Sequence, residues 1–190
     1  MIDTCGILLA AGAGARMGKP KALLRLGGET LLERGVRMLL EAGCNPIVVV
    51  LGAADYEVTD ARVTAIRNAD WESGMASSFR AGLAAASGPA AVIALVDQPG
   101  ITAAAVQRLR EAYRPGHATC ATFGGEQRTP VLFDAALWPQ VSAAVTGDAG
   151  ARYWLRRHPA LVIPVACDDL ADPTDLDVPE DLTRWERLCS

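Results

Sequence analysis

The chain has 190 residues, of which 51% are hydrophobic and 21% are charged, and its formal net charge is −4 at pH 7. This composition excludes a protein that is disordered as a whole, and the mild acidity argues against a nucleic-acid partner bound through a basic face. The length predicts a single domain over residues 1–190 with one sizeable core.

The sequence carries no pattern typical of a secreted protein or of a membrane protein. The N-terminus lacks the basic start of a secretory leader, and no apolar run reaches the roughly 18 residues of a membrane span. The five cysteines are dispersed and form no Cys-x-x-Cys pair. We therefore expect a soluble, cytoplasmic protein with no membrane partner and no zinc site.

Short apolar runs alternate with helical patterns over the first two thirds of the chain. The segments predicted as strands are 6–10, 46–51, 63–66, 90–96 and 117–123. The segments predicted as helices between them are 30–42, 77–86 and 103–113. Uninterrupted apolar strands separated by helices indicate a parallel sheet covered on both faces. The sequence predicts a Rossmann-like three-layer α/β/α sandwich with a mostly parallel central sheet.

The last third has a less regular pattern. Its predicted elements are a strand over 131–133, a helix over 149–157, a strand over 161–165 and a closing helix from Pro179.

A glycine-rich loop follows the first predicted strand, where ligands bind in open parallel sheets. It fails the dinucleotide fingerprint because Met17 stands at the third glycine position, and it also fails the P-loop spacing. Its small residues still let backbone N–H groups approach phosphates, and Arg16 and Lys21 supply positive charge. A glycine turn with solvated basic residues is the alternative.

The same stretch reads Leu9-Ala-Ala-Gly-x-x-x-Arg16-Met-Gly18-x-x-Lys21 and resembles the signature of MobA-like nucleotidyltransferases. Four further stretches match the molybdenum cofactor cytidylyltransferase branch in order, namely 68–83, 97–99, 147–152 and 175–181. The resemblance implies Mg²⁺-dependent transfer of CMP from CTP to a molybdenum–molybdopterin acceptor, with release of pyrophosphate. It also implies handover of the product to a molybdoenzyme or its chaperone.

The resemblance assigns roles to particular residues. The implied catalytic residues are Arg16, Lys21 and Asp97, and the implied acceptor residues are Asp148 and Arg152. The implied nucleotide-binding residues are Leu9, Ala10, Ala11, Gly12, Gly14, Arg16, Lys21, Asn68, Gly74 and Ser78. Ser77 and Ser78 both stand at the start of a predicted helix, where capping is the favoured role for at least one of them. Capping is also the alternative for Asp148, before a helix beginning at Ala149.

Asp97 directly follows a buried strand, which suits a ligand of Mg²⁺, although an Asp that opens a turn is an alternative. Asp175 and Asp177 alternate along an extended segment, so only one of them should face Asp97. The resemblance favours Asp175 as the second metal ligand, with Asp177 as its substitute. Glu180 and Asp181 fit the first turn of the closing helix instead.

Two stretches bear on the substrates. Cytidylyltransferase relatives carry Leu-Ala-Ala-Gly and guanylyltransferase relatives carry Leu-Ala-Gly-Gly, so Ala11 favours CTP. The segment Gln127-Arg128-Thr129-Pro130 departs from the branch's Arg-Gly-His-Pro and leaves the acceptor open. Alternative functions are a guanylyltransferase, a sugar-phosphate nucleotidylyltransferase, a non-catalytic cofactor carrier and, less favoured, a dehydrogenase.

Overall fold

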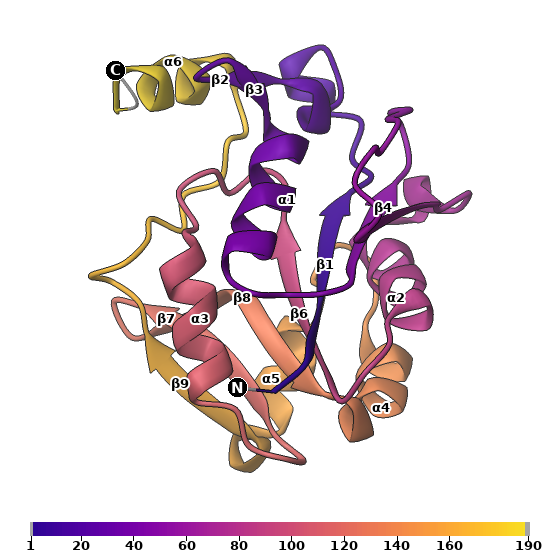
Figure 1. The fold of residues 1–190 in the computed structure, drawn as a ribbon, viewed down its shortest axis with the longest axis vertical. Coiled ribbons are helices and arrows are strands. Elements are labelled where there is room, and N and C mark those ends of the chain that lie inside the picture. Colours follow the sequence, from indigo (N-terminus) through magenta and orange to yellow (C-terminus); the bar gives the residue numbers. More distant parts are fainter. Residues whose placement is uncertain (1, 189–190) are drawn as a thin grey trace.

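A computed structural model describes residues 2–188. Seven strands form one sheet in the order β5-β4-β1-β6-β8-β7-β9 (Figure 1). Their bounds are Thr4–Ala10 (β1), Ile47–Leu51 (β4), Val63–Arg67 (β5), Ala90–Leu95 (β6), Ala118–Phe123 (β7), Glu126–Asp134 (β8) and Val162–Ala166 (β9). Only β8 runs antiparallel to its neighbours in this sheet, so the predicted mostly parallel sheet is confirmed.

Helices cover both faces of the sheet (Figure 1). One face carries α1 (Leu31–Glu41) and α3 (Ala103–Glu111), and the other carries α2 (Met75–Ala85), α4 (Trp138–Ala144) and α5 (Arg152–Arg157). A short hairpin of β2 (Arg25–Leu26) and β3 (Glu29–Thr30) contacts the closing helix α6 (Pro179–Leu188). This arrangement is the predicted three-layer sandwich.

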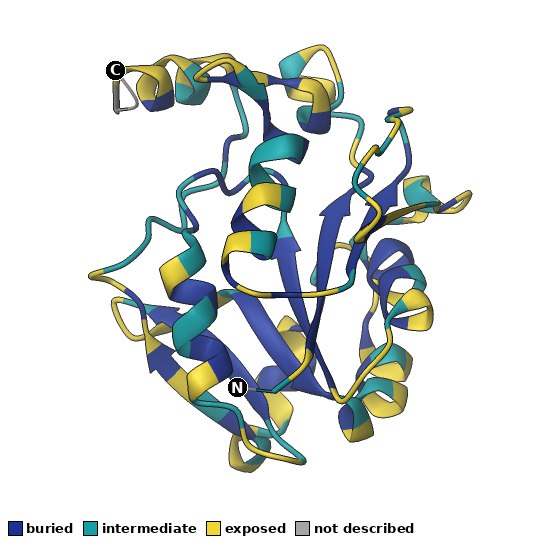
Figure 2. Cartoon of the chain, viewed as in Figure 1, coloured by how far each residue is buried: buried dark blue, intermediate teal, exposed yellow. Residues whose placement is uncertain are grey.

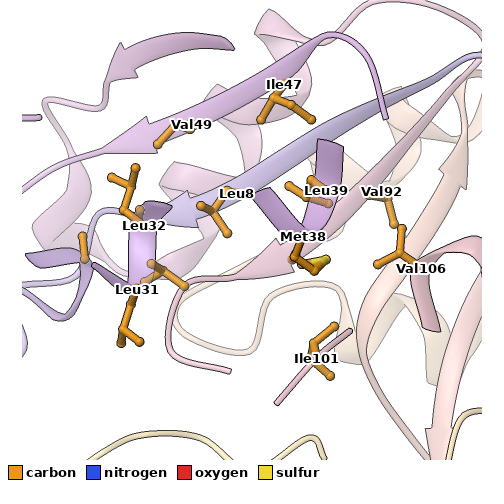
Figure 3. Packing of buried hydrophobic residues seen from close by; sticks show 14 of the residues in the cluster. Leu8, Leu31, Leu32, Met38, Leu39, Ile47, Val49, Val92, Ile101 and Val106 are labelled. Atoms are coloured by element: carbon orange, nitrogen blue, oxygen red, sulfur yellow. The ribbon is translucent and has the colours of Figure 1, made fainter. Parts of the chain in front are cut away.

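The core is divided by the sheet because successive strand side chains point to opposite faces. Leu8 packs in the cluster that contains Leu32 and Leu39 of α1 (Figure 3), whereas Ile7 packs with Phe79 of α2. The central strands are therefore buried on both sides (Figure 2), which explains why they read as continuous apolar runs.

Local sequence signals fix where α1 begins. The Thr30 hydroxyl accepts a hydrogen bond from the Glu33 backbone N–H, and the Glu33 carboxylate accepts one from the Thr30 N–H. This reciprocal pair satisfies two donors that the helix itself leaves free, and a cap of this kind contributes about 1 kcal/mol.

Several elements differ from their predicted bounds. β8 begins five residues before the predicted 131–133 strand, and α5 begins at Arg152 rather than Ala149. Neither α4 nor the β2–β3 hairpin was predicted. In the described part of the chain, five 3-10 helices complete the fold, at Ala15–Met17, Lys21–Leu23, Trp71–Ser73, Ala135–Leu137 and Pro159–Leu161.

Within residues 2–188, none of the helices combines the length and the apolar character that a bilayer crossing needs.

Candidate active site

The candidate site lies where the order of the strands reverses. From β1 the chain passes to β4 on one side, and it later returns to β6 on the other side of β1. The loops that leave β1 and β6 diverge at such a point and form a crevice at the carboxyl ends of the strands. These are the glycine loop and the segment that begins with Asp97.

The glycine loop presents free backbone donors. The N–H groups of Gly12, Ala13 and Gly14 have no hydrogen-bond partner in the described part of the chain. Gly14 has a φ of 61°, and a Cβ there would collide with the carbonyl oxygen of Lys19, so the turn requires glycine. A Cβ at Gly12 would meet only open space. The loop therefore has both the donors and the room to accept an anionic group.

Lys21 links the glycine loop to two carboxylates. Its Nζ atom lies 2.7 Å from Asp97 Oδ2 and 2.6 Å from Asp177 Oδ1. The Arg16 guanidinium lies 3.1 Å from the same oxygen of Asp177. The Lys21 side chain is only 15% exposed, whereas that of Arg16 is 67% exposed. Lys21 is thus a fixed charge at the base of the site, and Arg16 is a solvated charge at its rim.

The environment keeps Lys21 and Asp177 ionised. Burial lowers the pKa of Lys21, but the two carboxylates outweigh it and raise that pKa above its ordinary value. The hydrogen bond from Lys21 is the main reason that the pKa of Asp177 is lowered. Asp175 behaves in the opposite way. Burial raises its pKa, and the charges of Asp97 and Asp177 raise it further.

The C-terminal tail brings both carboxylates to the site. The Leu176 N–H donates to the Asp97 carbonyl oxygen at 2.7 Å, and the Asp172 N–H donates to Gly100 at 3.1 Å. Asp175 lines a cavity together with Asp97. Asp177 and Asp97 both form an ion pair with Lys21. This segment is not a strand, so the strand alternation that was used to choose between Asp175 and Asp177 does not apply to it. Which of the two faces a metal at Asp97 stays a prediction.

The carboxylates present fit a metal site that protein and substrate complete together, rather than one formed by protein ligands alone. Residues 2–188 contain no group of three or more His, Cys, Asp or Glu side chains that could enclose a metal ion. Mg²⁺ usually takes one or two carboxylates and completes its shell with water and substrate phosphates. Asp97 and Asp175, which border one cavity, match that donor set.

The cavity has a volume of about 810 Å³. Its lining includes the apolar side chains Leu9 and Leu95 and the charged side chains Asp148, Arg152 and Arg156. The two predicted acceptor residues therefore face the same space as the predicted metal ligands. Arg156 was not predicted, although its spacing of four residues from Arg152 on a helix places both on one face.

Asp148 has a structural role that differs from the predicted one. Its Oδ1 atom accepts a hydrogen bond from the Met75 N–H at 3.1 Å, which places it at the start of α2. The alternative that Asp148 caps a helix beginning at Ala149 is wrong, since α5 begins at Arg152 and has no side-chain cap. Gly74 has a φ of 110°, and a Cβ there would lie 2.9 Å from Asp148 Oδ1.

Asn68 organises the loop before α2. Its Nδ2 atom donates to the hydroxyls of Ser77 at 2.8 Å and Ser78 at 3.0 Å, and its Oδ1 accepts the Asp70 N–H at 3.0 Å. Asn68, Ser77 and Ser78 are all buried. Both amide hydrogens of Asn68 are used within the protein, so nucleotide contacts by Asn68 and Ser78 stay predictions.

Gln98 is a site residue that the sequence reasoning did not single out. It is buried, and it contacts Asp175 on one side and Thr129 on the other. Gln98 lies between Asp97 and Pro99 in a motif that follows a predicted strand, and this position could have identified it as a site residue.

Comparisons with known proteins agree with this geometry. Residues 6–162 match the model of the MobA-like NTP transferase domain. The chain belongs to the MobA-like NTP transferase family. The resemblance noted in the sequence is thereby confirmed at the level of the family, and the protein is an enzyme of the nucleotidyltransferase type.

Curated relatives, among them the two that follow, cover nearly the whole chain. A nicotine blue oxidoreductase from Paenarthrobacter nicotinovorans is 42% identical and covers 94% of each chain. A molybdenum cofactor guanylyltransferase from Rhodobacter capsulatus is 32% identical over 95% of this chain and 94% of its own. The names of these relatives differ in the reaction that they describe.

Solved structures share the fold. A nucleotidyl transferase from Methanothermobacter thermautotroptrophicus superposes with a TM-score of 0.83 at 24% identity, over 98% of this chain and 97% of its own. A Mycobacterium tuberculosis protein in complex with manganese has a TM-score of 0.74 at 23% identity, over 98% of each chain.

Proposed function

We propose that the enzyme transfers CMP from CTP to a molybdenum–molybdopterin acceptor and releases pyrophosphate, with Mg²⁺ as its cofactor. The observation that carries the proposal is the meeting of Arg16, Lys21 and Asp97 at the carboxyl ends of β1 and β6. Nucleotidyl transfer needs little covalent help, and positioning with charge stabilisation does most of the work. The accompanying proposals are one domain over residues 1–190, action in the cytoplasm and handover to a molybdoenzyme or its chaperone.

Lys21 is suited to a triphosphate. An ammonium group has three N–H donors, and two of them are directed at Asp97 and Asp177. We infer that the third N–H donates to a phosphate oxygen of the nucleotide. Arg16 lies at the exposed rim, where its fork of donors suits the departing pyrophosphate. Asp97 and Asp175 would hold Mg²⁺, which supplies positive charge at the phosphates when bound.

Ala11 is the basis of the preference for CTP. It is buried at the end of β1, and its carbonyl oxygen accepts the Ala53 N–H at 3.0 Å. A methyl group held there narrows the space beside the loop more than a glycine would, which disfavours a purine. GTP is the alternative, and the Rhodobacter capsulatus relative named as a guanylyltransferase supports it.

Pyrophosphate release measured with CTP, GTP, ATP and UTP in the presence of Mg²⁺ and molybdopterin acceptor tests this choice. We expect CTP to be used best, and we expect Ala11→Gly to raise the use of GTP relative to CTP. Equal or better use of GTP by the unmodified enzyme would refute the preference for CTP.

The relative from Paenarthrobacter nicotinovorans, named a nicotine blue oxidoreductase, supports a second candidate, an oxidoreductase that acts on nicotine blue. The cavity beside Asp97, which is lined in part by the apolar side chains Leu9 and Leu95, is the place that such a substrate would occupy. Oxidation of NADH or NADPH in the presence of nicotine blue tests this candidate in the same preparation. Nicotinamide oxidation without pyrophosphate release in any nucleotide mixture would replace the leading proposal with this one.

A further inference from the structure

Gln98 connects three segments that are far apart in the sequence. Its Oε1 atom accepts a hydrogen bond from the Thr129 hydroxyl at 2.6 Å. Its Nε2 atom donates to Asp175 Oδ1 at 2.9 Å and to the Pro173 carbonyl oxygen at 3.3 Å. The side chain is 7% exposed, so these contacts are made largely away from water.

The chemistry of the partners determines which way the amide points. The Asp175 carboxylate and the Pro173 carbonyl are acceptors only, so the NH₂ end must face them. The Oε1 end then needs a donor, and the Thr129 hydroxyl supplies it. Removing that hydroxyl would leave a buried acceptor unpaired, which favours displacement of the amide. Thr129 therefore acts on Asp175 through Gln98 without touching the carboxylate.

The hydrogen bond also determines which oxygen of Asp175 stays available. Oδ1 is engaged by Gln98, while no hydrogen bond to Oδ2 is present among the described residues. Asp97, Gln98, Thr129 and Asp175 all line the 810 Å³ cavity. The carboxylate is thus held at one oxygen by protein, and the other oxygen remains free to bind a cation.

We propose that Thr129 and Gln98 are positioning residues that hold the Asp175 carboxylate in place for a divalent cation bound with nucleotide in this cavity. The inference rests on the proposed function for the metal, and it does not depend on the acceptor or on the choice of nucleotide. It also gives a role to the segment 127–130, which departs from the family pattern. In this chain the segment supplies the hydroxyl that orients Gln98.

The test is binding of Mn²⁺ in the presence of CTP, and separately of GTP, measured from the electron paramagnetic resonance signal of free Mn²⁺. Loss of a partner that orients a metal ligand typically lowers metal affinity by 10- to 100-fold. We expect Thr129→Val to weaken Mn²⁺ binding by about 10-fold, and Thr129→Ser, which keeps the hydroxyl, to stay within about 2-fold of the unmodified enzyme.

Thr119→Val is the matched control, because Thr119 is buried in the neighbouring strand β7 and its hydroxyl has no hydrogen-bond partner within residues 2–188. Its Mn²⁺ affinity should not change. A double-mutant cycle adds a second readout. Once Asp175→Asn has removed the carboxylate, Thr129→Val should cause no further loss of Mn²⁺ affinity. Gln98→Met should reproduce the effect of Thr129→Val, and it serves in its place if Thr129→Val does not fold.

Unchanged Mn²⁺ affinity in both Thr129→Val and Gln98→Met would overturn the inference, and so would equal losses in Thr129→Val and Thr129→Ser. Failure of the unmodified enzyme to bind Mn²⁺ with either nucleotide would overturn it together with the metal assignment. Failure of the proposed function looks different. Mn²⁺ would bind and respond to Thr129 as expected, yet no pyrophosphate would be released with the molybdopterin acceptor.

Discussion

Replacing Lys21 by methionine tests whether the Lys21 ammonium group stabilises the fold by holding the Asp97 and Asp177 carboxylates together. Methionine keeps most of the apolar stem and removes the ammonium group. Asp97 and Asp177 would then face each other without the cation between them. We expect a less stable protein, because two partly buried carboxylates lose their shared partner.

The distances give the magnitude. The two carboxylate oxygens lie 2.7 and 2.6 Å from Nζ, so they are at most about 5 Å apart. Two unit charges at that distance repel each other by about 3 kcal/mol at an effective dielectric constant of 20. The Asp177 side chain is 39% exposed, and water screens part of this repulsion. We therefore expect a loss of about 1–2 kcal/mol, which corresponds to a fall in Tm of about 2–8 °C for a chain of this size.

Thermal unfolding at pH 7 and low salt measures this loss, with Lys19→Met as the control. Lys19 is exposed and makes no ion pair in the described part of the chain. A fall in Tm for Lys21→Met that is no larger than the fall for Lys19→Met would refute the reasoning.

The dependence on pH follows from the shifted pKa values. The folded pKa of Asp177 is lowered, so its contribution is present above its ordinary value of 3.8 and is lost as pH falls through the folded value. The folded pKa of Lys21 is raised, so its contribution is present below its ordinary value of 10.5 and is lost as pH rises through the folded value. The difference between the unmodified protein and Lys21→Met should therefore be largest near neutral pH and smaller at both extremes.

Three further substitutions have defined outcomes. Asp97→Asn should reduce pyrophosphate release by about 100-fold or more while the circular dichroism spectrum stays unchanged, because it removes a charge from the reacting site. Gly14→Ala should lower stability by about 1–3 kcal/mol in urea unfolding, since its φ is 61° and its Cβ would strike a carbonyl oxygen, whereas Gly12→Ala has open space and should not. Tyr113→Phe should cost about 1–2 kcal/mol in the same assay, because the Tyr113 hydroxyl donates to the buried Asp134 carboxylate at 2.6 Å. Burial and Asp134 raise the pKa of Tyr113 to about 12, so absorbance titration should find it protonated at pH 11.

The sheet could be predicted because its central strands carry their signal locally. Every residue of β4 is buried, and so is every residue of β1, because helices cover both faces. Such strands are apolar at nearly every position, which produces runs that a single sequence reveals. The glycine loop was predictable for a similar reason, since its backbone requires particular small residues at fixed positions.

Elements that depend on distant contacts were not predicted. The β2–β3 hairpin has only two residues in each strand, around Gly27 and Gly28, and its contact with α6 comes from the other end of the chain. Helix α4 did carry a local signal, since Pro139 lies in its first turn. The bond from Leu176 to Asp97, which brings the tail to the site, is not encoded in any local pattern.

Two of the stretches that carry the family resemblance, 68–83 and 147–152, are joined by hydrogen bonds. Asp148 accepts the N–H of Met75, and the carbonyl oxygen of Gly147 accepts the N–H of Ala76 at 2.8 Å. The segment predicted to bind acceptor thus holds the first turn of α2, whose Ser77 in turn accepts a hydrogen bond from Asn68. A loss of activity in Asp148→Ala would therefore have two sources, a disturbed helix and a lost acceptor contact. Since removal of a cap lowers stability by about 1 kcal/mol, only a rise in the KM for acceptor without a matching fall in Tm would assign Asp148 to the acceptor.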